Sequence, residues 1–491
     1  MTLGTLLLYI GIAAIVLTGG VLALKRNKNV LITYLQNFCG ALFLFSGWVK
    51  AVDPLGTAYK MEQYFAEFES TFEATWFSFL APMFPFLSNY SIGFSVGMIV
   101  FEIVLGAMLL IGMTNKWTSW AFLSLVVFFT FLTGFTYLTG YVPNDVNFFQ
   151  FGSWGPYVES NMKVTDCGCF GDFIKLKPKT SFFKDVFLLI PAILFVLQHK
   201  NMHELFTSKV RGIITGIVTV GTLVYCISNY SWDLPDVDFR PFAVENNVAE
   251  IKRVELEAAA NVQVTDYKLT NKSSGEVVSV PYAEFMKRFQ EFPKEEWEYE
   301  QIRSKPAIEA TKVSEYSFQD EDGIEYADDL LADDNYHFLI VCYKYYYDTE
   351  SETVLVNDTT YVADTIVTAD TSYVVQKIDS VKKREASQTK YIWDTDYQKI
   401  FKNKINPLAE AAEKAGYKVT AVVGGAGPEA IEEFRHSTQT AYPFYMADDI
   451  LLKTIVRSNP GVVLFKNGKI VNKWHHKKLP SFAEMEAKKF Q

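Results

Sequence analysis

Six apolar stretches dominate the first half of this chain of 491 residues. A run of about 20 apolar residues is long enough to cross a lipid bilayer as a helix. The six predicted spans are residues 3–24, 31–52, 92–113, 117–140, 182–198 and 210–230. We do not interpret the first as a signal peptide, because its basic cluster (Lys25, Arg26, Lys28) follows the apolar run. Residues 1–231 are therefore predicted to form a multi-span helical membrane bundle.

Charge divides the chain into the same two halves. Residues 1–231 carry 14 Lys/Arg and 12 Asp/Glu, a net charge of +2. Residues 232–491 carry a net charge of −12, which gives the whole chain a net charge of −10. A strongly acidic soluble half argues against nucleic acid as a partner. The expected partners are membrane lipid and another protein.

The distribution of basic residues predicts the orientation in the membrane. Short loops rich in Lys and Arg stay on the cytoplasmic side. With the N-terminus outside, the inner loops carry one acid, Glu204, and seven basic residues: Lys25, Arg26, Lys28, Lys116, Lys200, Lys209 and Arg211. Six spans then place the C-terminal soluble half outside as well.

The soluble half has two predicted parts. Residues 232–335 begin with a linker rich in proline and acidic residues and continue into strand-like runs, so a small β-rich region is expected there. From residue 336 onward, strands alternate with helices and end in a hairpin and a closing helix. This order resembles a thioredoxin fold over 336–491, and Pro460 matches the position of the cis-proline of that fold.

The predicted thioredoxin-like domain lacks the usual dithiol. No Cys-x-x-Cys follows its first strand, where only Cys342 is found, and an insertion over 344–395 separates that strand from the next helix. The runs Val354–Tyr361 and Tyr373–Val381 predict a hairpin in this insertion, and a flexible arm is the alternative. The domain is expected to bind a client or partner. We expect His475 and His476 to be surface residues on alternating faces.

The two cysteines that are close in sequence, Cys167 and Cys169, carry the strongest chemical signal. A disulfide across Cys-Gly-Cys closes a small, strained ring, and Gly168 permits the backbone angles that such a ring needs. Exposed strained disulfides are the labile or catalytic ones. Nearby lysines would favour a thiolate; they are Lys175, Lys177 and Lys179. A static disulfide, a bridge to Cys226 and half of a zinc site are the alternatives, although no metal ligand set is apparent.

An ionisable residue inside a span is the second candidate. Glu102 lies in the middle of the third span, and a charged group there is expensive and commonly functional. Lys50, near the outer end of the second span, can reach inward to Glu102 or outward to water. Ser46 is one turn before Lys50 on the same face. A structural ion pair or hydrogen bond is the alternative to a role in proton transfer.

These residues carry a family resemblance. The run Phe45–Ala58 (FSGWVKAVDPLGTA) resembles the opening helix of DoxX-like membrane proteins, and Asp166–Asp172 (DCGCFGD) is similar to the outer-loop signature of the related MauE branch. Glu102 matches the intramembrane acid of the family, and Ser181–Asp185 matches the entry to the helix after the cysteine loop. The resemblance covers about 31–230. It implies periplasmic thiol–disulfide chemistry and quinone-linked oxidation in the inner membrane.

The function predicted from these features is a membrane thiol–disulfide redox protein. Clients in the periplasm would exchange disulfides with Cys167 and Cys169, and electrons would pass to a quinone while Glu102 manages the proton. Gly168 and Asp172 would shape the loop. The alternative is a non-enzymatic membrane anchor or subunit of an envelope complex.

Overall fold

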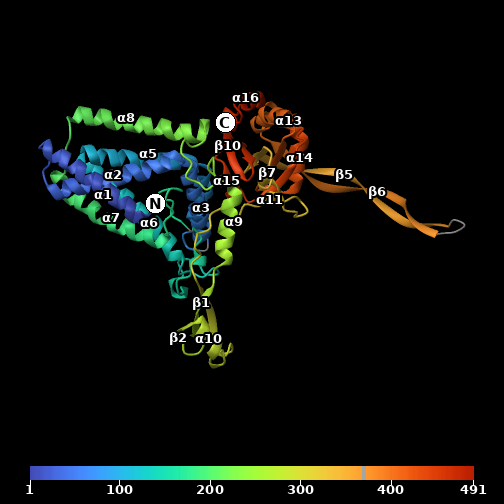
Figure 1. Cartoon of the computed structure of the whole chain (residues 1–491), viewed down its shortest axis with the longest axis horizontal. Coiled ribbons are helices and arrows are strands. Elements are labelled where there is room, and N and C mark those ends of the chain that lie inside the picture. The colour runs from blue at the N-terminus through green and yellow to red at the C-terminus, as the bar shows by residue number, and fades with distance from the viewer. Residues whose placement is uncertain (74, 165, 368–371, 491) are drawn as a thin grey trace. The chain divides into compact units, whose positions relative to one another are not determined.

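The computed structural model describes residues 1–73, 75–164, 166–367 and 372–490. The described chain divides into two compact units, Met1–Ala243 and Val244–Gln491, and each is described by itself (Figure 1). The prediction of a helical membrane bundle followed by a sheet-containing region is confirmed.

The first unit contains, within the described residues, six helices long and apolar enough to cross a membrane. They are α1 (Leu3–Ala23), α2 (Val30–Val52), α5 (Ser91–Ile111), α6 (Asn115–Thr139), α7 (Pro178–Gln198) and α8 (Ser208–Ile227). Helix α7 begins four residues before the predicted start, because Pro178 occupies its first turn, where a missing N–H is harmless. A π-helical turn, Ser228–Trp232, extends α8.

Helix α2 lies at the centre of this bundle and contacts α1, α5 and α7. Its closest approach is to α5, where a Cβ on Gly106 would lie 2.9 Å from the carbonyl oxygen of Gly40. Small residues let two membrane helices approach this closely. A buried apolar cluster that includes Phe43, Phe122 and Phe195 fills the space between α2, α6 and α7.

The long connection between α2 and α5 is helical, which the hydropathy pattern did not predict. It forms α3 (Pro54–Glu73), a 3-10 turn at Ser78–Leu80 and α4 (Met83–Asn89). Tyr64 and Phe68 of α3 are one turn apart and both buried, and the Tyr64 hydroxyl lies 2.8 Å from Thr136 Oγ1. Helix α3 therefore packs against the bundle through one apolar face, and its overall hydropathy is too low for a membrane span.

The second unit begins with α9 (Val248–Ala260) and a small antiparallel sheet. Its strands are β1 (Val264–Asn271), β2 (Val277–Pro281) and β3 (Trp297–Arg303), in the order β2-β1-β3. Helix α10 (Tyr282–Arg288) covers this sheet with Phe285, whose ring lies 4.1 Å from that of Tyr267.

A five-stranded mixed sheet forms the main core of the second unit. Its strands, in the order β10-β9-β4-β7-β8, are β4 (His337–Cys342), β7 (Lys418–Gly424), β8 (Phe444–Ala447), β9 (Gly461–Lys466) and β10 (Lys469–His475). Strands β4, β7 and β8 are parallel, whereas β9 runs antiparallel to β4, and β10 to β9. The helices of this part are α11 (Ala327–Leu331), α12 (Thr395–Ile400), α13 (Asn406–Lys414), α14 (Pro428–Thr438), α15 (Asp449–Ile455) and α16 (Phe482–Ala487).

The insertion after β4 is a long antiparallel ribbon. Strand β5 (Tyr347–Val367) pairs along its length with β6 (Ser372–Trp393). Figure 1 shows this ribbon extending away from the five-stranded sheet. Its base is held by aromatic side chains, since Trp393 contacts Tyr345 and Phe434 at ring-centroid distances of 5.4 and 4.9 Å. Of the two alternatives for the insertion, the structure therefore has the hairpin.

Of the two adjacent histidines, His475 is buried, so the expectation of a surface residue was wrong for it, whereas His476 is half-buried. His475 ends β10 and is buried, and the chain turns into a 3-10 helix at His476. Because the strand ends there, the side chains do not continue to alternate, and the two rings lie 4.3 Å apart. His476 Nδ1 lies 3.1 Å from Ser458 Oγ.

Candidate functional site

The cysteine loop of the first unit is a tight turn. Gly168, between the two cysteines, has a φ of +60°, a conformation that glycine adopts without steric cost. The backbone N–H of Gly168 donates to Asp166 Oδ1 at 3.1 Å, and Asp166 in turn forms an ion pair of 2.9 Å with Lys60 of α3. Cys167 and Cys169 are free thiols in this structure.

Cys169 faces the helix bundle. Its carbonyl oxygen accepts a hydrogen bond of 2.9 Å from the Ser46 hydroxyl of α2, and its side chain packs against the apolar cluster of the bundle. Burial raises the pKa of the Cys169 thiol, and the ammonium groups of Lys184 and Lys50 act in the opposite direction. Ser46 and Cys169, which are far apart in sequence, therefore belong to one site.

Cys167 faces a different set of groups. Burial raises the pKa of its thiol to about 12, and the neighbouring Cys169 adds to this rise. The hydroxyls of Ser181 and Tyr64 oppose the shift, because each can donate to the thiolate. Helix α3, which carries Tyr64 and Lys60, thus lies over the Cys167 side of the loop.

A buried ion pair joins two membrane helices close to this loop. Lys50 Nζ of α2 lies 2.6 Å from Glu102 Oε2 of α5, and the two side chains are only 6% and 2% exposed. The ammonium also lies 5.0 Å from the centre of the Phe129 ring. Of the two orientations open to Lys50, the structure has the inward one. Each charge thereby compensates the other in a region where an isolated charge is very costly.

A second buried ion pair stands at the start of α7. Lys184 Nζ lies 2.6 Å from Asp185 Oδ1, and the side chains are 13% and 2% exposed. Thr133 of α6 donates to Asp185 Oδ2 at 3.0 Å, and the Lys184 ammonium lies 5.8 Å from the centre of the Phe170 ring. In the sequence, Lys184 and Asp185 stand out only as part of the family-like run Ser181–Asp185. The available signal was a Lys-Asp pair at the start of an apolar helix.

The lysines expected to favour a thiolate are directed elsewhere. Lys175 lies 3.8 Å from Asp172, and Lys177 forms an ion pair of 2.9 Å with Glu159; both lysine side chains are more than half exposed. The charges that act on Cys169 come instead from Lys184 and Lys50. Closeness in sequence therefore did not predict which lysines act on Cys169, because the loop turns its cysteines toward the bundle.

The other cysteines and Pro460 have different surroundings. Cys39, Cys226 and Cys342 are buried free thiols, and Cys226 packs in an apolar cluster with Ala51, Val96, Ile99 and Ile103. Pro460 belongs to the second unit, where the Asn459–Pro460 peptide bond is cis. Among the described residues, no group of three or more His, Cys, Asp or Glu side chains is placed to hold a metal ion.

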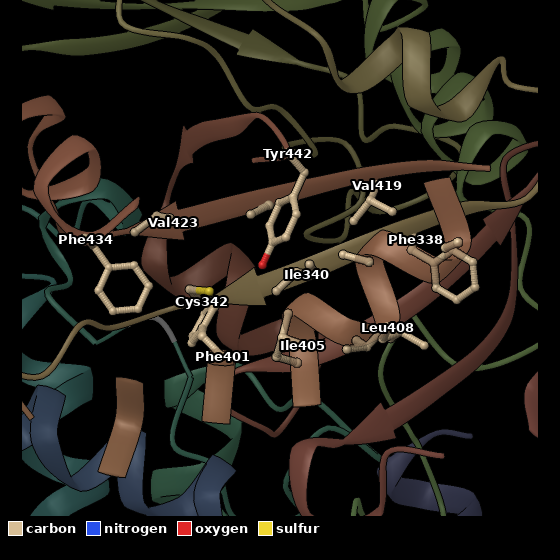
Figure 2. Packing of buried hydrophobic residues seen from close by; sticks show 14 of the residues in the cluster. Phe338, Ile340, Cys342, Phe401, Ile405, Leu408, Val419, Val423, Phe434 and Tyr442 are labelled. Carbon is tan, nitrogen blue, oxygen red and sulfur yellow. The ribbon is translucent and has the colours of Figure 1, made fainter. Parts of the chain in front are cut away.

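The buried thiol of the second unit stands in an apolar and aromatic core. Figure 2 shows the Cys342 side chain at the end of β4, with the Tyr442 hydroxyl pointing toward it. Burial raises the pKa of the Cys342 thiol to about 12. This cysteine therefore has the surroundings of a packing residue.

Comparison with known proteins gives one family match. The family described as "Methylamine utilisation protein MauE" matches residues 28–144. No curated protein matches the chain. No solved structure matches it either. The matched segment includes Ser46, Lys50 and Glu102 and ends before the cysteine loop. Over these residues, and with its six apolar helices, the chain is similar to the MauE membrane proteins.

Proposed function

We propose that this protein is a membrane thiol–disulfide redox protein that exchanges disulfides through Cys167 and Cys169. The observation that carries the proposal is the placement of Cys169 beside two buried lysines, Lys184 and Lys50. Buried charges are costly, and perturbed titratable groups are commonly found at functional sites. The similarity to MauE proteins supports a membrane accessory role for the same half of the chain.

The proposed redox cycle has two steps, and electrons and protons balance in each of them. A client dithiol reduces the Cys167–Cys169 disulfide, so the client becomes a disulfide and the loop receives two electrons and two protons. The loop dithiol then gives two electrons and two protons to a membrane quinone, and its disulfide is restored. Glu102, paired with Lys50, would hold or release one of these protons within the bundle.

An apolar groove offers an entry for a lipid-soluble ring. It has a volume of about 730 Å³ and is formed by α4 and α5, with Phe86, Tyr90, Phe94, Met98 and Phe101 among its lining residues. Phe101 precedes Glu102, whose carboxylate is buried in the bundle. Binding of a quinone ring is part of the proposal.

We also infer that the five-stranded part of the second unit is a thioredoxin-like domain. Support comes from three parallel strands followed by an antiparallel hairpin, β9–β10, and the closing helix α16. Its cysteine, Cys342, is buried, and the long ribbon β5–β6 stands where a dithiol would be expected. The domain would therefore bind a client or partner without dithiol chemistry of its own.

The proposed location is the inner membrane, with both termini and the cysteine loop on the periplasmic side. Supporting this, the loop between α1 and α2 meets the loop between α7 and α8 at one end of the bundle. There Glu204 pairs with Lys28 at 3.0 Å and with Arg211 at 2.7 Å. These loops are rich in basic residues, as cytoplasmic loops are.

The test is disulfide exchange by the purified full-length chain in detergent. A reduced peptide dithiol serves as client and a short-chain quinone as oxidant. We expect Cys167→Ser and Cys169→Ser each to reduce client oxidation to the rate without protein, because each removes one sulfur of the disulfide. Cys226→Ser is the matched control and should keep full activity. Full activity in both loop variants would contradict the proposal.

A second candidate function is a non-enzymatic anchor or subunit of an envelope complex. The raised pKa of Cys167 favours it, because a thiol protonated at neutral pH is a weak nucleophile. In that case the loop variants would lose no function, and a partner would co-purify with the chain at fixed stoichiometry.

A further inference from the structure

We propose that the two cysteines have different roles: Cys167 meets the client, and Cys169 is the internal cysteine whose thiolate is stabilised by Lys184. This inference rests on the proposed function and deepens it. It assigns the order of events within the loop and gives the Lys184–Asp185 pair a part in the reaction.

The first support is the direction in which each cysteine faces. Cys169 is anchored to α2 by the hydrogen bond from Ser46 and packs against the apolar cluster of the bundle. Cys167 lies between the bundle and α3, next to Asp166, whose carboxylate is held by Lys60. Both cysteines keep partial exposure. The anchored cysteine is the poorer target for a bulky client, because its backbone is hydrogen-bonded to α2 and its side chain packs against the bundle.

The second support is the charge distribution. Cys169 faces Lys184 and Asp185 of α7, Lys50 of α2, the Ser181 hydroxyl and Tyr64 of α3. The Glu102 carboxylate of α5 also interacts electrostatically with the Lys184 ammonium. Cys167 faces hydroxyls, the other cysteine and Asp166, and the lysine on its side of the loop, Lys60, is paired with the Asp166 carboxylate. A negative charge that forms on Cys169 is therefore stabilised better than one on Cys167.

The exchange step follows from this asymmetry. A client thiolate attacks Sγ of Cys167, the Cys167–Cys169 bond breaks, and Cys169 leaves with the electron pair as a thiolate. Stabilisation of the leaving thiolate speeds such an exchange. The second client thiol then attacks the client sulfur of the mixed disulfide and releases Cys167. The two protons of the client end on the two cysteines.

The first experiment measures alkylation by iodoacetamide against pH, with the full-length chain in detergent and peptide mass spectrometry as the readout. In the Cys167→Ser background, we expect Lys184→Met to shift the alkylation of Cys169 to higher pH, because the stabilising ammonium is lost. Lys184→Arg should restore the original profile. In the Cys169→Ser background, Lys184→Met should leave the profile of Cys167 unchanged. Lys175→Met is the matched control for a surface lysine.

The second experiment needs no variant of Lys184 and so does not depend on how well Lys184→Met folds. The oxidised wild-type chain is treated with a bulky peptide monothiol, and the cysteine thiol that is released is alkylated at once. We expect the mixed disulfide at Cys167 and the alkyl group at Cys169, and much less of the reverse. Equal labelling, or a shift of both alkylation profiles by Lys184→Met, would overturn the assignment. If the asymmetry holds and wild-type protein oxidises no client, the proposed function fails and the assignment of the two cysteines stands.

Discussion

Replacement of Glu102 by leucine is expected to lower the free energy of unfolding of the membrane unit by about 3–5 kcal/mol. The substitution leaves the ammonium of Lys50, which is 6% exposed, without the carboxylate 2.6 Å away. A buried charge without its partner retains its full desolvation cost. Thermal unfolding of the full-length chain in detergent, followed by tryptophan fluorescence, measures the loss.

The matched control is Glu159→Leu. Glu159 also pairs with a lysine, Lys177, at 2.9 Å, but the two side chains are 60% and 67% exposed. Exposed ion pairs contribute on the order of 0–1 kcal/mol, so this variant should unfold close to wild type. An equal effect of the two substitutions would contradict the assignment of Lys50–Glu102 as a buried pair.

A paired substitution separates structure from function at this site. Lys50→Met combined with Glu102→Leu removes both charges, and such replacements commonly restore stability. If the double variant is stable and oxidises the client at the wild-type rate, the pair is structural, which is the alternative that the sequence left open. If it is stable and inactive in the quinone-dependent step, the carboxyl takes part in proton transfer.

Replacement of Phe434 by alanine is the second change with a large expected effect, in the second unit. Phe434 is fully buried, and its ring contacts those of Tyr345, Phe401 and Trp393 at centroid distances of 4.5, 4.8 and 4.9 Å. Phe-to-Ala changes in a core cost about 3–5 kcal/mol, through lost burial and the cavity left behind. We therefore expect a corresponding loss of stability in the five-stranded core.

Hydrogen exchange of the full-length chain measures this loss locally. Peptides from β4, β7 and α12 should exchange faster in Phe434→Ala, and so should the base of the ribbon, where Tyr345 and Trp393 lie. The control is Phe289→Ala, since that side chain is 53% exposed in the same unit. Unchanged protection in the Phe434 variant would show that the ribbon base does not depend on this ring.

Local patterns accounted for much of the fold. The six spans follow from hydropathy, because a membrane helix satisfies its own backbone and needs only length and apolar side chains. Strands β7, β9 and β10 and helices α14, α15 and α16 follow from periodicity and from Pro and Gly at their ends, whereas β8 (Phe444–Ala447) was not predicted. Helix α3 was not predicted, because its overall hydropathy is low. Its buried face is recognised only from the contacts of Tyr64 with α6 and of Phe68 with α4.

Only part of the candidate site could be predicted from the sequence. Sequence alone identified Cys167, Cys169 and Glu102 as candidates, because the residue types themselves carry the chemistry. It could not say that Lys184 rather than Lys175 acts on Cys169, or that Lys50 turns inward. Those outcomes depend on how residues from α2, α5, α7 and the loop meet, over separations such as the 52 residues between Lys50 and Glu102. Electrostatic interactions fall with distance in space and not along the chain, so only the tertiary structure decides which charges form one site.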